Sequence, residues 1–308
     1  MPPHAPHSEI AGSGHSNGPP RVLAAIVTHN RIKLLQQSVH ALRQQAFRPA
    51  STLVIDNSST DGTREWLDGQ ADLTVIRQPN SGSAGGTYRA AKHGYEEGFD
   101  WIWMMDDDTI PSPNALERLV SSPAIQRPNT GFVYSLQVYP DGTVPTNDPG
   151  PTGPEEWALS ILQDRCMPVK RCSFVAMMVS RRVVASVGYP MKEMFFMGDD
   201  HEYTRRIVEA GYKGYCVLDS IVLHDTKLPL AFDTRSWNPL KKRYWSRNGV
   251  YLIRTSSDPW PRKAWIIARM FQIELFRLFR GASNFSVIAW LLKGFYFNPK
   301  AERPGGNQ

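Results

Sequence analysis

The feature that most constrains this 308-residue chain is an apolar run that ends in three adjacent carboxylates. Residues Trp101–Met105 have the composition of a strand buried inside a sheet, and Asp106, Asp107 and Asp108 follow directly. Three acids at one strand end repel one another and lose hydration unless a cation lies among them. Because open α/β sheets bind ligands at the carboxyl ends of their strands, the run predicts a Mn²⁺ or Mg²⁺ site on a diphosphate. The alternative is a solvated acidic turn.

Similar apolar runs alternate with helical patterns along the first hundred residues. Strands are expected at Arg21–Val27, Thr52–Ile55 and Leu73–Ile76, with helices between them. This order predicts the α/β class: a doubly wound, mostly parallel sheet with a Rossmann-like nucleotide-binding half and a C-terminal helical extension. We expect a disordered tail over 1–20, a catalytic domain over 21–237, and a helical segment over 238–308 that meets the acceptor or a membrane.

Three further stretches bear on chemistry. Asn80–Gly86 is a small-residue loop before the expected helix Thr87–Gly98, and such loops let backbone N–H groups approach an anion, although taken alone the stretch is more simply explained as a plain loop. Asp199, Asp200 and Glu202 fall in the first turn of a helix, beside an apolar Phe-Phe-Met run that could raise the pKa of a carboxylate and make it a base. The helix dipole alone could also explain acids there. His224 ends the strand Tyr215–Leu223 and is a candidate metal ligand.

The net charge and the cysteine content bear on which kinds of partner and fold are compatible with the chain. The net charge is +6, which suits nucleic acid, anionic lipid or a phosphorylated ligand, but no nucleic-acid-binding module is present. Three cysteines without a CxxC pair argue against a disulfide framework. In the expected helix Trp260–Arg280, Arg262, Arg269 and Arg280 share one line beside broad apolar faces. This arrangement favours docking on an anionic membrane surface, although the helices could instead pack on the catalytic domain.

Taken together, these motifs resemble family 2 glycosyltransferases of the GT-A fold over about residues 21–255. Within that family, Trp101–Asp108 and Asn80–Gly86 look most like the galactofuranosyltransferases of actinobacteria, and rhamnosyltransferases of lipid-linked glycans are also similar. One departure is that Ser81 and Ser83 stand where the family's loop often has Leu and Gly. That departure leaves the identity of the sugar open.

The resemblance implies roles residue by residue. Thr28 and Asp56 would line the nucleotide base, while Arg31, Asn80, Gly85, Gly86 and Asp107 would lie beside the nucleotide sugar. Asp106, Asp108 and His224 would hold the metal ion, and Asp200 would be the catalytic base of an inverting transfer. The candidate acceptor contacts are Trp103, Asp199, Glu202 and the Arg247-Asn248 pair.

The activity implied is transfer of galactofuranose from UDP-galactofuranose to a lipid-linked glycan of the cell wall or surface polysaccharide. It would take place on the cytoplasmic face of the cell membrane, with the enzyme bound peripherally. The alternatives are a rhamnosyltransferase that uses dTDP-rhamnose and a non-catalytic module that binds sugar nucleotides or glycans. A nucleotidyltransferase would share the sheet and the metal acids, but the Gly-rich loop with a basic residue near the first strand is absent. The oligomeric state stays open, with a homo-oligomer as one option.

Overall fold

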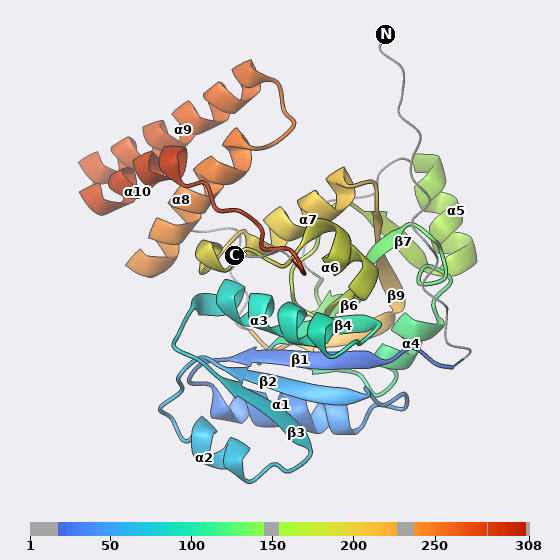
Figure 1. The fold of residues 1–308 in the computed structure, drawn as a ribbon. Helices are drawn as coiled ribbons and strands as arrows, with labels where there is room; N and C mark the ends of the chain where they lie inside the picture. The colour runs from blue at the N-terminus through green and yellow to red at the C-terminus, as the bar shows by residue number, and fades with distance from the viewer. Residues whose placement is uncertain (1–17, 145–153, 227–236, 282, 306–308) are drawn as a thin grey trace.

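The computed structural model describes residues 18–144, 154–226, 237–281 and 283–305. Its centre is a nine-stranded sheet in the order β3-β2-β1-β4-β8-β6-β9-β5, with β7 pairing with β9 (Figure 1). The strands are β1 (Val22–Thr28), β2 (Ser51–Asp56), β3 (Leu73–Arg77), β4 (Trp101–Asp106), β5 (Thr109–Pro111), β6 (Thr130–Val138), β7 (Cys166–Val169), β8 (Met177–Ser180) and β9 (Lys213–His224). The expected α/β class with a mostly parallel sheet is confirmed.

The first four strands of this order are parallel, and their register fixes the site. Thr28 of β1 lies opposite Asp56 of β2, and Val27 lies opposite Asp106 of β4. The carboxyl ends of these strands therefore meet along one edge of the sheet. The central strand β1 is buried throughout because neighbours cover it on both faces.

Helices cover both faces of the sheet. One face packs against α3 (Gly82–Glu96), α6 (Arg181–Val187) and α7 (Asp199–Glu209). The other face packs against α1 (Ile32–Arg43), α2 (Thr63–Asp68) and α4 (Ala115–Ser121). In α1, Leu35, Val39 and Leu42 are buried at the spacing of one helical face, which explains why this segment is helical and amphipathic. Helix α5 (Pro154–Asp164) lies beside β7.

The C-terminal segment forms three helices to one side of the sheet, drawn in orange and red in Figure 1. They are α8 (Pro239–Arg254), α9 (Trp260–Phe279) and α10 (Phe285–Tyr296). Beyond α10 the chain returns to the helices that cover the sheet, where Glu302 accepts a 2.8 Å hydrogen bond from Lys92 of α3. No helix in the described part of the chain is both long and apolar enough to cross a membrane.

One expectation about the elements is wrong. The small residues Gly82–Gly86 lie inside α3 instead of preceding it. Close packing explains why glycine is used in this helix, since a Cβ on Gly86 would lie 2.3 Å from a side-chain carbon of Val27. The tail expected over 1–20 lies outside the described residues as far as residue 17.

Candidate functional site

The acid triplet lies at the end of β4 and is held by two residues from the end of β1. Asp107 and Asp108 are buried. The Thr28 hydroxyl donates to Asp107 at 2.8 Å, and the Arg31 guanidinium donates to Asp107 at 3.2 Å and to Asp108 at 2.8 Å. Thr28 itself is buried, so its hydroxyl orients a carboxylate of the triplet.

His224 joins the triplet from the other part of the sheet. It ends β9, where it pairs with Thr109 of the short strand β5, and this places its Nε2 3.4 Å from Oδ1 of Asp108. Its ring stacks on Tyr139 with centroids 5.8 Å apart. Of the predicted metal ligands, Asp108 and His224 are thus in contact, and Asp106 lies at the end of the adjoining strand β4.

The buried carboxylates of the triplet shift one another's pKa values. Burial, reinforced by the charges of Asp108 and Asp107, raises the pKa of Asp106 to about 7. Burial likewise raises the pKa of Asp107 to about 6, against the opposing effect of Arg31. Burial would also raise the pKa of Asp108, but contacts with His224 and Arg31 outweigh it and hold that pKa below its usual value. A cation at this edge would stabilise the ionised carboxylates of Asp106 and Asp107 and so lower their pKa values.

The residues expected beside the nucleotide lie on the neighbouring strand ends. Asp56 at the end of β2 is buried, and its Oδ1 accepts the backbone N–H of Ser59 at 2.9 Å. The next residue, Asn57, donates to the carbonyl of Gly82 at 3.1 Å, and this bond ties the end of β2 to the start of α3. Asn80 accepts the N–H of Gly82 at 2.9 Å, so its side chain shapes the turn that precedes the helix.

The second acid cluster lies at the start of α7, where Gly198 adopts a left-handed φ of +83° just before it. Asp199 is buried, and burial, the charge of Asp200 and that of Asp106 raise its pKa well above the usual value. Asp200 is only half-buried, and its Oδ1 accepts the N–H of His201 at 2.7 Å. Asp200 is therefore the more accessible carboxylate of the pair.

Three residues that were expected to contact the acceptor make contacts within the protein instead. Trp103 is fully buried and donates its indole N–H to the carbonyl of Ala176 at 3.2 Å, so it offers no surface to an acceptor. Glu202 is buried and forms a 2.8 Å ion pair with Arg206 that belongs to the packing of α7. Arg247 is half-buried, and its guanidinium lies 3.8 Å from the centre of the Phe297 ring.

Residues that the sequence did not single out complete the framework. Gln78 donates to Asn57 at 2.8 Å and to Ser81 at 2.7 Å, which links β3 to the start of α3. His29 contacts the carbonyl of Asn57 at 2.8 Å through its Nδ1. Only their position directly after strand ends could have marked them.

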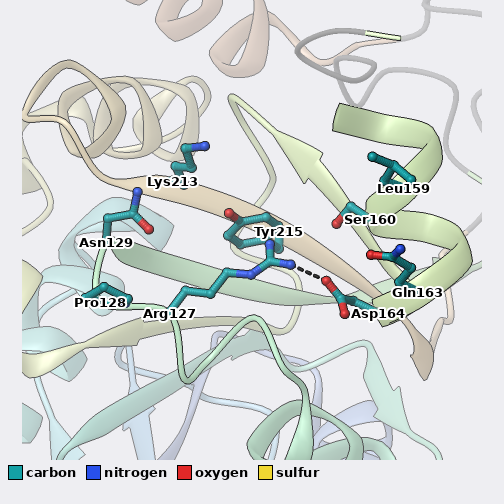
Figure 2. A pocket seen from close by; sticks show the side chains of 9 residues that line it. All are labelled: Arg127, Pro128, Asn129, Leu159, Ser160, Gln163, Asp164, Lys213 and Tyr215. Atoms are coloured by element: carbon teal, nitrogen blue, oxygen red, sulfur yellow. Dashed lines mark hydrogen bonds and ion pairs between the residues drawn. The ribbon is translucent and has the colours of Figure 1, made fainter. Parts of the chain in front are cut away.

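A separate cavity of about 390 Å³ lies away from these acids (Figure 2). Residues just before β6 and at the start of β9 form one wall, and α5 forms the other. Arg127 and Asp164 make an ion pair across it. Because β6 and β9 are parallel, the cavity lies at the opposite strand ends from His224.

Comparison with known proteins supplies the family. The model of glycosyl transferase family 2 matches residues 24–188, which is more than half of the chain. The chain belongs to this family. This glycosyltransferase is 27% identical over 219 residues to the galactofuranosyltransferase GlfT1 of Mycolicibacterium smegmatis, covering 66% of this chain and 70% of the relative. It is 35% identical over 107 residues to the undecaprenyl-phosphate mannosyltransferase of Micrococcus luteus, covering 33% and 44%.

Solved structures agree on the architecture. The glycosyltransferase superposes on GalNAc-T7, solved with UDP, GalNAc and Mn²⁺, with a TM-score of 0.57 and 15% identity. The match covers 77% of this chain and 52% of that one, so the chain spans about half the length of GalNAc-T7. The fold is GT-A, as the sequence suggested.

The strand-end residues fit a divalent ion by their chemistry. Asp106 and Asp108 supply the carboxylate oxygens that Mg²⁺ and Mn²⁺ prefer, and the buried Oδ1 of Asp108 has only the 3.4 Å contact with Nε2 of His224. Across the described residues, no three His, Cys, Asp or Glu side chains converge into a ready cage. A site of one or two carboxylates completed by substrate phosphates is the arrangement typical of Mg²⁺.

Proposed function

We propose that this glycosyltransferase moves a sugar, with inversion, from a nucleotide diphosphate donor to a glycan acceptor carried by a lipid. The donor we favour is UDP-galactofuranose. The similarity to GlfT1 over most of the catalytic half supports that donor. The lipid-linked acceptor is supported by the relative that is named for undecaprenyl phosphate.

One observation carries this proposal: two acid groups from distant parts of the chain converge. Asn57 at the end of β2 donates to the carbonyl of Gly82 at 3.1 Å, and the N–H of Ala84 in α3 donates to the carbonyl of Phe195 at 3.2 Å, so hydrogen bonds join the strand ends to the segment before Asp199 and Asp200. The charge of Asp106 also contributes to the raised pKa of Asp199. A transferase needs this arrangement because the bond that breaks, between the sugar and the diphosphate, lies between the metal and the base.

The base is assigned to Asp200. Its half-buried carboxylate can meet an acceptor hydroxyl, whereas the neighbouring Asp199 is buried and is kept protonated to a higher pH. Asp200 would take the proton from the hydroxyl as its oxygen attacks the anomeric carbon. One base suffices, since a diphosphate leaves without protonation, unlike the sugar oxygen in glycoside hydrolysis.

On the donor side, Asp106 and Asp108 would hold a Mn²⁺ or Mg²⁺ ion, with His224 beside them. When bound, the ion supplies positive charge that neutralises the departing diphosphate. Arg31, paired with Asp107 and Asp108, is positioned to exchange these partners for donor phosphate oxygens. Asp56 would lie beside the nucleotide base, while Thr28 would hold Asp107 in place through its hydroxyl.

The C-terminal helices supply the surface for a membrane-held acceptor. Large apolar side chains stand in solvent there, including Trp265 at 68%, Phe279 at 89% and Tyr296 at 89% exposure. Arg262, Arg269 and Arg280 of the predicted line are exposed too. Apolar insertion and attraction to anionic headgroups together give reversible docking.

A screen of nucleotide sugars tests the proposal. The purified chain is incubated with UDP- and dTDP-sugars, a short acceptor glycan and Mn²⁺ or Mg²⁺, and release of nucleotide diphosphate is followed. We expect release with UDP-galactofuranose that depends on acceptor. Release with dTDP-rhamnose alone would favour the rhamnosyltransferase alternative, and binding of sugar nucleotides without any release would favour the non-catalytic module.

A further inference from the structure

The segment that leads into α7 has an unusual backbone. Phe195 and Met197 have φ values of +62° and +72°, and Gly198 has +83°. Left-handed φ is costly for residues with a side chain and persists only where the surroundings hold it. Asp199 and Asp200 follow this segment directly, so whatever fixes it also fixes the acids.

Asn248 of α8 provides that restraint. Its Nδ2 lies 3.0 Å from the carbonyl oxygen of Met194, 3.1 Å from that of Phe196 and 2.7 Å from that of Met197. Its two N–H bonds are shared among these three acceptors, and the residue is only 1% exposed. The neighbouring Arg247 adds a 3.1 Å bond to the carbonyl of Met194. Asn248 is thus not the donor or acceptor contact that the sequence suggested.

The same segment is fixed on its other side by the start of α3. The N–H of Ala84 donates to the carbonyl of Phe195 at 3.2 Å, and Gly82 leaves no room beside that oxygen. The Phe195 ring stacks on Tyr244 of α8 with centroids 4.6 Å apart. The segment therefore lies between the start of α3 and α8, and each contributes hydrogen bonds to its carbonyls.

We propose that Asn248 is a positioning residue that sets the 194–198 segment and thereby places Asp200 for the acceptor hydroxyl. The inference rests on the proposed function, in which Asp200 is the base. It gives α8 a role besides membrane docking, because the helix would hold the segment that positions the base. This helix lies outside residues 24–188, the part of the chain that the family model matches. Misplacement of a reacting group by about 1 Å can cost about a hundredfold in rate.

The test compares Asn248→Ala, Asn248→Asp and Asn248→Ser in the full chain. Asp has the same shape but faces carbonyls with a carboxylate, so we expect the largest loss, about a hundredfold or more in kcat. Ser keeps one hydrogen-bond donor on a shorter side chain, so the kcat of Asn248→Ser should lie between those of Asn248→Ala and wild type. The donor KM should change less than fivefold. Asn238→Ala is the control, because Asn238 caps the same helix by accepting the N–H of Lys241 at 2.7 Å and does not touch the segment.

Hydrogen exchange of the backbone amides gives a readout that needs no activity. In Asn248→Ala we expect faster exchange over 195–200 and unchanged exchange in β4, whereas Asn238→Ala should leave both unchanged. Equal exchange over 195–200 in wild type and Asn248→Ala would overturn the proposal. So would kcat within threefold of wild type for the variants, or a loss confined to the donor KM. If wild type transfers no sugar, the proposed function fails and the exchange result alone decides whether Asn248 holds the segment.

Discussion

Gly82→Ala is the substitution that most directly tests the packing of the start of α3 against the segment before Asp200. A Cβ at this position would lie 1.8 Å from the carbonyl oxygen of Phe195, so reaching even 3.0 Å requires a shift of 1.2 Å. The obstacle is backbone, which cannot rotate away as a side chain can. Ala at a φ of +73° costs about a further 1–2 kcal/mol. Together with overpacking, we expect the free energy of unfolding to fall by about 2–5 kcal/mol.

The same shift should reach the chemistry. Since the displaced carbonyl lies five residues before Asp200, we expect kcat to fall about a hundredfold. Denaturant unfolding and nucleotide release are measured on Gly82→Ala and on Gly211→Ala. Gly211 has a φ of +90° with nothing within 4 Å of a built Cβ, so this control carries the backbone cost without the collision. Equal stability of the two variants, with Gly82→Ala turning over within threefold of wild type, would refute the packing argument.

Two further predictions follow from the acids and the C-terminal surface. Excess EDTA should abolish turnover, and Asp108→Ala should weaken metal-dependent donor binding at least tenfold, measured by calorimetry with and without Mn²⁺; full activity in EDTA would contradict the metal assignment. Reversing Arg262, Arg269 and Arg280 to Glu should release the protein from anionic vesicles while leaving transfer to short soluble acceptors intact, because each arginine near the surface contributes about 1 kcal/mol. Co-sedimentation at low and high salt measures this, and equal pelleting of both proteins would show that these helices only pack on the enzyme.

The parallel half of the fold could be predicted because its strands are short apolar runs that end in polar residues. The expected runs at β1, β2 and β4 match the observed strands within a residue or two at each end. The start of α3 could not be predicted, since glycine disfavours helices and its use there depends on the approach of β1. In the same way, β5 exists only because Thr109 pairs with His224 from far along the chain.

The position of a candidate residue was predictable where residue type and strand end coincide: Asp56 and His224 end their strands, and His224 lies beside Asp108. The sequence was less informative where burial determines whether a residue can contact a substrate, because sequence alone does not show how deep a side chain lies. Trp103 belongs to the core, although the family resemblance implied that it contacts the acceptor. The role of Asn248 depends on carbonyls about fifty residues earlier, and no local pattern marks such a contact.

The most direct test of the central claim is the rate of Asp200→Asn beside that of Asp199→Asn. Asn keeps the size of the carboxyl but cannot accept the proton, so Asp200→Asn should bind the donor with an affinity within threefold of wild type and lose about 10²–10⁴ in kcat. Because burial raises the pKa of Asp199, an amide there resembles its protonated form, and Asp199→Asn should lose much less. Single-turnover transfer with saturating donor gives both rates. A crippled Asp199→Asn beside a nearly wild-type Asp200→Asn would contradict the assignment of the base.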